Sequence, residues 1–238
     1  MLLNILTALT LTVVVVLALQ HGLAYRAPGG LVLLFYFLVF CLLQWRSGRR
    51  KVETSHSWDI LGQRFALDLV QADAAFRRHE GSGRRLEQYF CYGEAIVAAA
   101  DGTVVRVEDG VADAPFVGWG FCDFTARHFA GSHVIIRHAE GEFGVYAHLI
   151  KGSVCVRPGD TVRQGDLVGR CGHSGHSTEP HLHFHLQDSP DFFRGMGLPI
   201  RFHDIVVNGV PAASARGRAA QRVRNATQSP NSVQPRAD

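Results

Sequence analysis

The chain has 238 residues and a formal net charge of +3, which is enough sequence for one ordinary domain with additional segments. The net positive charge comes from the last 27 residues, which hold five arginines and one acidic residue. The rest of the chain is therefore close to neutral and gives no indication of a nucleic-acid-binding face. We expect no nucleic acid among the partners.

Two long uncharged runs open the chain. Residues 2–19 form a run of 18 and residues 27–45 a run of 19, and each is long enough to cross the core of a bilayer, which takes roughly 20 residues. The simplest interpretation is a membrane anchor over residues 1–51 made of two transmembrane helices. The alternative is a cleaved signal peptide followed by one anchor, although the start of the chain lacks a basic n-region.

The charges that follow the second run bear on the orientation of this anchor. Arg46, Arg49, Arg50 and Lys51 lie directly after it, while no lysine or arginine precedes the first run. The positive-inside rule would therefore place the following domain in the cytoplasm.

From residue 95 onward the pattern is typical of short β-strands joined by turns. The expected strands are 95–98, 103–107, 133–138, 143–150, 153–156 and 166–168, with Asp101-Gly102 as the first turn. This predicts an all-β domain of short, turn-linked strands over residues 52–211. Residues 212–238 are predicted to be a disordered tail, because they contain almost no large apolar side chains.

The five cysteines form no CxxC pair, which makes a structural zinc ribbon a poor interpretation. Cys41 lies in the second uncharged run. The other four, namely Cys91, Cys122, Cys155 and Cys171, could pair in an oxidising compartment or serve as small buried apolar residues.

The most informative segment runs from His181 to Leu186. In a strand, alternate side chains face opposite ways, so three histidines (181, 183 and 185) share one face and the apolar residues share the other. The apolar face would pack in a core while the imidazoles line a cleft. A histidine-rich solvated face is the alternative.

Several motifs resemble those of the lysostaphin/LytM family of zinc metallopeptidases. They are Gly175-His176-Ser177-Thr178-Glu179-Pro180-His181-Leu182-His183-Phe184, Tyr146-Ala147-His148-Leu149, and the turns Gly159-Asp160 and Gly165-Asp166. The resemblance covers roughly residues 60–187 and implies an antiparallel β-roll with a groove over its sheet. It also implies hydrolysis of peptide bonds in peptidoglycan, so the expected partner is a peptidoglycan peptide and the expected cofactor is Zn²⁺.

The resemblance also implies roles for individual residues. Asp68 and His183 would bind zinc, while His148 and His181 would act as catalytic groups on the water and the developing oxyanion. A catalytic zinc takes three protein ligands and leaves one position open. The family's first ligand belongs four residues before Asp68, where this chain has Arg64, and a guanidinium does not serve as a normal zinc ligand.

Two histidines are candidates for the missing third ligand. His56 precedes Asp68 by twelve residues and is the preferred candidate, because the intervening chain is long enough to turn back across a groove. His79 lies in a more polar stretch and is the weaker one. His138 is expected to be structural, while His173 and His176 would line the groove, support the site or lie exposed in their loop.

Two functions are compatible with these residues. The first is a zinc metalloendopeptidase that cuts peptidoglycan, located at the bacterial inner membrane with its catalytic domain on the periplasmic, extracytoplasmic side. The second is a degenerate domain that binds cell wall or a partner protein and regulates another hydrolase. Arg64 favours the second function, whereas the presence of Asp68, His148, His181 and His183 favours the first.

Overall fold

The computed structural model describes residues 61–120, 122–123, 125–217 and 221–226, all within a compact unit that spans residues 51–238. The predicted membrane anchor at residues 1–51 and His56 lie outside the described residues. Within the described ranges, no helix has both the length and the apolar character needed to cross a bilayer.

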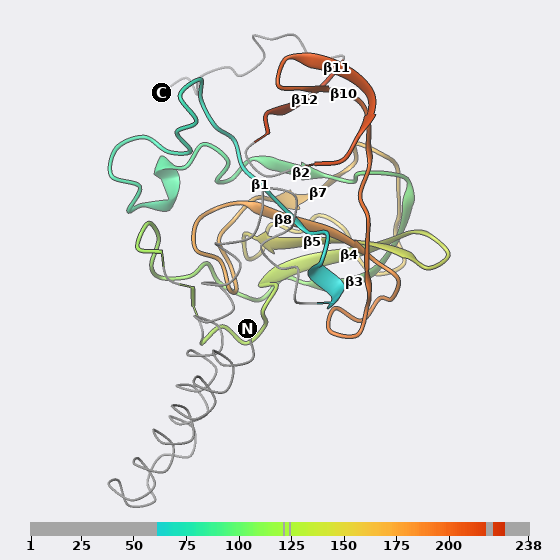
Figure 1. The fold of residues 1–238 in the computed structure, drawn as a ribbon. Coiled ribbons are helices and arrows are strands. Elements are labelled where there is room, and N and C mark those ends of the chain that lie inside the picture. Colours follow the sequence, from blue (N-terminus) through green and yellow to red (C-terminus); the bar gives the residue numbers. More distant parts are fainter. Residues whose placement is uncertain (1–60, 121, 124, 218–220, 227–238) are drawn as a thin grey trace, which may run out of the picture. The chain divides into compact units, whose positions relative to one another are not determined.

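The described part is an all-β fold with antiparallel sheets, as predicted. Its main sheet has the strand order β1-β8-β5-β4-β3-β6, with β9 added beside β8 (Figure 1). These strands are β1 (Leu67–Leu69), β3 (Gly102–Glu108), β4 (Ser132–Ala139), β5 (Glu142–Leu149), β6 (Thr161–Val162), β8 (Leu182–Gln187) and β9 (Gly197–Leu198). Two short 3₁₀ helices, η1 (Leu61–Gln63) and η2 (Leu86–Gln88), precede β1 and β2.

Two smaller sheets complete the fold. β2 (Ala95–Val97) pairs with β7 (Leu167–Arg170), so the strands predicted near these positions are present. The prediction of a strand at residues 153–156 is wrong, because these residues form no strand in the structure. The Cys155 N–H donates to the Val168 carbonyl at 2.9 Å, which ties this segment to β7 without a regular ladder.

The prediction of a disordered tail from residue 212 is wrong for two segments. β10 (Phe202–Val207) pairs with β11 (Val210–Ala215) on one side and with β12 (Val223–Asn225) on the other. Asn208 and Gly209 connect β10 to β11 with φ angles of 50° and 85°. Two successive positive φ angles are characteristic of the type I′ hairpin turn that Asn-Gly favours, so local turn chemistry extends the order past residue 211.

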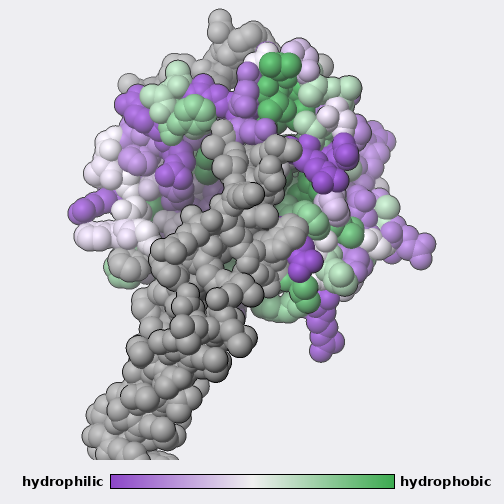
Figure 2. All heavy atoms as spheres, viewed as in Figure 1, coloured by the Kyte–Doolittle hydropathy of each residue, from purple (hydrophilic) through white to green (hydrophobic). Residues whose placement is uncertain are grey.

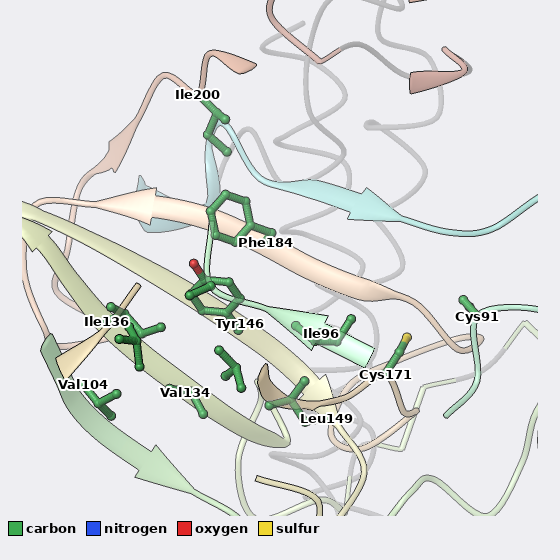
Figure 3. Packing of buried hydrophobic residues seen from close by; sticks show 13 residues of the cluster. Cys91, Ile96, Val104, Val134, Ile136, Tyr146, Leu149, Cys171, Phe184 and Ile200 are labelled. Carbon is green, nitrogen blue, oxygen red and sulfur yellow. The ribbon is translucent and has the colours of Figure 1, made fainter. Parts of the chain in front are cut away.

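The larger of two apolar clusters fills one face of the main sheet. Its members include Val104, Val134, Ile136, Tyr146 and Phe184, all less than 5% exposed (Figure 3). The predicted apolar face of the strand at 182–186 is confirmed, because Leu182 and Leu186 pack against this cluster beside Phe184. Because these side chains pack in the cluster, the opposite face of β8 is the one that presents histidines.

On the face drawn in Figure 2, hydrophilic and hydrophobic residues are interspersed over the described surface.

Candidate metal and catalytic site

The candidate site lies where β1, β8 and β5 run side by side (Figure 1). Asp68 of β1 is the register partner of His183 of β8, and Ala147 of β5 is the partner of His183 on its other side. Directly opposed residues in a sheet present their side chains on the same face. The pairing therefore places a carboxylate, an imidazole and a small methyl group in one row.

Three imidazoles converge above this row. One ring nitrogen each of His148, His181 and His183 lies within 4.8 Å of the others, and all three residues are buried. The Asp68 Oδ1 atom lies 2.8 Å from His183 Nδ1 and 3.5 Å from His181 Nε2. The Asp68 side chain is 36% exposed, whereas the two imidazoles are 5% and 8% exposed. The carboxylate is thus the member of the group through which solvent reaches the cluster.

His148 reaches this cluster by leaving the regular strand conformation. Tyr146 and Leu149 belong to the apolar cluster on the far face, and strict alternation would also send the His148 side chain there. Instead His148 has φ = 62°, and its ring centroid lies 4.8 Å from that of His181. A left-handed conformation costs a non-glycine residue about 1–2 kcal/mol. The surrounding hydrogen bonds, including His148 N–H to the Ala130 carbonyl at 2.9 Å, hold it in place.

Backbone carbonyls determine which nitrogen of two imidazoles carries the proton. His148 Nδ1 lies 2.7 Å from the Ser174 carbonyl oxygen, and His181 Nδ1 lies 2.7 Å from the Glu179 carbonyl oxygen. A carbonyl oxygen only accepts, so each Nδ1 donates and each neutral ring has its lone pair on Nε2. Burial and the neighbouring imidazoles of His181 and His183 hold the pKa of His148 well below its usual value. His148 is therefore neutral, with its lone pair on Nε2.

A second row of side chains supports His181. Ser177 Oγ donates to the Glu179 carbonyl at 2.7 Å and lies 3.3 Å from His181 Nδ1. His173 Nδ1 lies 2.8 Å from the same hydroxyl, and His173 Nε2 donates to the Phe116 carbonyl at 3.0 Å. His173 is fully buried, so of its three expected placements the supporting one is observed. The role of Ser177 was not predicted, since a serine in a Gly/Ser-rich loop carries no distinctive signal.

The third of the alternating histidines, His185, does not belong to the cluster. His185 is fully buried, its Nε2 lies 2.9 Å from Gln187 Oε1, and its ring packs against Phe192. The prediction that all three alternate histidines line a cleft is wrong for His185, because Phe192 covers that end of the strand. Burial lowers the pKa of His185 to about 3.

His133 of β4 is another buried neutral imidazole on the same face. Its Nδ1 donates to the Gly131 carbonyl at 2.8 Å, and among the described residues its Nε2 has no hydrogen-bond partner. Burial lowers its pKa to about 4, below the value of about 6.5 expected in the unfolded chain. The unfolded chain therefore binds more protons between pH 6.5 and 4, and stability is lost as the pH falls through this window.

This depressed pKa gives a testable pH dependence. We expect the free energy of unfolding to decrease as the pH is lowered from 6.5 to 4.5, when it is measured by urea titration in the presence of a chelator. Each such histidine contributes about 1.4 kcal/mol per pH unit. His133→Gln, which does not titrate in this range, should reduce the slope by about that amount. An identical slope in the variant would show that His133 is not the group responsible.

The remaining sequence candidates fall at different places. Arg64 lies in the turn between η1 and β1, four residues before Asp68. The position expected to hold the first zinc ligand is therefore occupied by an arginine beside β1 in the chain. His79 pairs with Tyr89 in an isolated bridge and stacks on its ring at 5.1 Å, away from the three-histidine cluster. His138 bonds the Asp101 carbonyl at 2.9 Å and the Tyr146 hydroxyl at 3.2 Å, the structural role expected of it.

The donor set suits a zinc ion. Zinc prefers imidazole nitrogen and carboxylate oxygen at 2.0–2.2 Å in a tetrahedral arrangement, which separates the donors by about 3.4 Å. The three imidazole nitrogens lie within 4.8 Å of one another and Asp68 Oδ1 lies 2.8 Å from one of them, so small side-chain movements bring three donors to that spacing.

Comparison with known proteins agrees with this site. Residues 87–193 match Peptidase family M23. This span contains His148, His181 and His183, but it begins after Arg64 and Asp68. The match to this family and the similarity to a peptidoglycan DD-endopeptidase confirm the predicted resemblance to lysostaphin/LytM-type peptidases for this part of the chain.

The similar proteins are mostly much longer than the matched segment. A Haemophilus influenzae protein described as an uncharacterized metalloprotease is 31% identical over 138 residues, which are 53% of this chain and 25% of the relative. The peptidoglycan DD-endopeptidase ShyA of Vibrio cholerae is 37% identical over 70 residues, 29% of this chain and 16% of ShyA. The chain thus spans a quarter or less of these two relatives.

Among solved structures, the catalytic domain of lysostaphin from Staphylococcus simulans is 20% identical. That match covers 53% of this chain and 95% of the lysostaphin domain, with a TM-score of 0.33.

Proposed function

We propose that this chain is a zinc-dependent endopeptidase that hydrolyses peptide bonds in bacterial peptidoglycan. The observation that carries the proposal is the convergence of His148, His181 and His183 beside the exposed carboxylate of Asp68. The match of residues 87–193 to Peptidase family M23 and the similarity to a peptidoglycan DD-endopeptidase support it.

The residues divide into two roles. Asp68 and His183 would hold the ion, since they face each other across β1 and β8 with 2.8 Å between Oδ1 and Nδ1. Zinc at this position would supply a Lewis acid that polarises a peptide carbonyl and acidifies water. His148 and His181 present Nε2, the atom with which a neutral imidazole accepts a proton from water and passes it to the leaving amine.

Metal content is the first test of this proposal. The purified chain should contain one zinc per chain, lose it to a strong chelator together with cleavage of isolated peptidoglycan, and regain both when zinc is restored. A chain that is folded, free of zinc and unable to take it up would favour the second candidate function.

That second candidate is a degenerate domain that binds cell wall or a partner and regulates another hydrolase. The observation in its favour is Arg64, which occupies the position where the family pattern has a ligand. Against it stands the set of hydrogen bonds that fixes the tautomers of His148 and His181. A domain that only binds has no need of Nε2 lone pairs placed beside a carboxylate.

We propose that His56 completes the zinc site in place of the residue at position 64. His56→Ala should lower zinc affinity by about a hundredfold or more, since even outer partners of metal ligands are worth 10–100-fold. His79→Ala is the control, because His79 stacks on Tyr89 away from the cluster. Equal affinity in His56→Ala and the wild type would instead make an imidazole of the observed cluster the third donor.

We also propose that the domain lies outside the cytoplasmic membrane, since its substrate class is extracytoplasmic. This goes against the basic residues at positions 46–51, but long domains translocate largely regardless of such charges. A C-terminal alkaline phosphatase fusion, which requires an oxidising compartment, should be active in bacterial cells. An inactive phosphatase fusion together with an active cytoplasmic reporter at the same position would contradict this location.

A further inference from the structure

Cys91 and Cys171 lie together in the apolar cluster under the candidate site, and each is less than 5% exposed (Figure 3). A tight turn brings them together. The Glu94 N–H donates to the Cys91 carbonyl at 3.1 Å, so the chain reverses between these two residues. The Gly93 N–H then donates to the Cys171 carbonyl at 2.7 Å, and the Cys171 N–H donates to the Glu94 carbonyl at 2.9 Å.

These bonds continue the β2–β7 ladder by one step beyond Ala95 and Arg170. The turn that holds Cys91 is therefore docked on the backbone of Cys171, and both side chains belong to the same buried apolar cluster. Two buried thiols in one cluster, on segments joined by backbone hydrogen bonds, are placed to form a disulfide, which requires the two residues to be close in space.

Both cysteines adjoin the segments that carry the site. Cys91 Sγ donates to the Pro180 carbonyl at 3.1 Å, and Pro180 directly precedes His181. Cys171 forms an isolated bridge with Leu149, which directly follows His148. The pair thus lies between the two stretches of chain that position the proposed catalytic histidines.

From this arrangement we infer that Cys91 and Cys171 form an intramolecular disulfide that links the turn at residues 91–94 to the start of the loop before His181. The oxidant is an external disulfide, either a small molecule or a protein. One cysteine thiolate attacks it and releases one thiol, leaving a mixed disulfide. The second cysteine loses its proton and displaces the remaining group, so the oxidant leaves as two thiols and takes up two electrons.

Either cysteine can make the first attack, since the thiolate is the reactive form of each. Because both sulfurs are buried in the folded domain, the exchange takes place before the apolar cluster has closed around them.

The other two described cysteines provide internal controls. Cys155 is exposed and donates to the Ser153 carbonyl at 3.3 Å. Cys122 is partly buried, and burial raises its pKa to about 11, which disfavours its thiolate. Neither has the pair of backbone hydrogen bonds that joins the neighbours of Cys91 to Cys171.

The test is a peptide map of the full chain refolded with oxidised and reduced glutathione, with free thiols trapped by iodoacetamide. We expect the peptides of Cys91 and Cys171 to be linked, and Cys122 and Cys155 to be alkylated. Closing a loop of about 80 residues should raise the melting temperature by about 10 °C over the reduced chain.

Variants separate this disulfide from general effects of the oxidant. Cys91→Ala and Cys171→Ala should each abolish the redox-dependent rise in melting temperature, and Cys155→Ala should keep it. Alkylation of both Cys91 and Cys171 after oxidising refolding, or their linkage to other cysteines, would overturn the inference. If a variant does not fold, the map of the wild-type chain decides alone. Peptidoglycan cleavage is not measured, so this result is independent of the proposed function.

Discussion

His181→Ala and His148→Ala are each expected to abolish measurable cleavage of isolated peptidoglycan while the domain stays folded. Positioned proton transfer contributes about 10²–10⁴-fold to a rate, and each variant removes one Nε2 that the structure presents beside Asp68. Zinc should remain bound in both variants, because the proposed roles of these histidines are catalytic.

Rates, metal content and far-ultraviolet circular dichroism should be measured on the same preparations. His79→Ala is the matched control, since it removes an imidazole that lies outside the cluster and should leave the rate unchanged. Loss of zinc from either His148→Ala or His181→Ala would contradict the division of roles and make that residue a ligand. Full activity in both would contradict the proposed site.

His183→Ala and Asp68→Ala are expected to lower zinc affinity by more than about a hundredfold, beyond the loss that outer partners alone cause. The two residues oppose each other across β1 and β8, and their side-chain atoms approach to 2.8 Å. Competition with a chromophoric chelator measures this affinity directly and does not depend on turnover.

Asp68→Asn distinguishes a ligand from an outer partner. Asparagine keeps an oxygen within reach of His183 Nδ1 but lacks the charge that a zinc ligand supplies. A large loss of zinc in Asp68→Asn supports direct binding, whereas a loss of about tenfold would assign Asp68 to orienting His183. His185→Gln should change the affinity little, because His185 bonds Gln187 and packs on Phe192.

Local patterns in the sequence predicted much of the core of this site. Period-two alternation over residues 181–186 correctly separated Leu182 and Phe184, which pack in the apolar cluster, from His181 and His183. The same rule failed for His185, because alternation fixes only the face of a side chain. Whether that face is open to solvent depends on Phe192, which packs on His185 from the loop between β8 and β9.

His148 is the opposite case, because a family motif correctly predicted its place in the site and strand alternation would have predicted the other face. A regular strand would have placed its ring on the same face as Tyr146, in the apolar cluster. Its position in the site depends on a φ of 62°, which tertiary hydrogen bonds impose and no local propensity predicts for histidine. Only the resemblance of residues 146–149 to a family motif identified it.

The errors outside the site have local causes. Residues 153–156 carry apolar side chains typical of a strand, but they run beside β7 without forming a ladder. The ordered segments beyond residue 211 depend on the Asn208-Gly209 turn and on pairing with β10, and their low content of large apolar residues concealed both.

The central claim is that this chain cuts peptide bonds in peptidoglycan, and the most direct test is mass spectrometry of isolated peptidoglycan treated with the purified, zinc-loaded chain. The account predicts products with new free amine and carboxyl ends on the peptides and with intact glycan strands. These products should be absent when a chelator is present or when His181 is replaced by alanine. Peptides left fully intact by a folded chain that holds one zinc would contradict it.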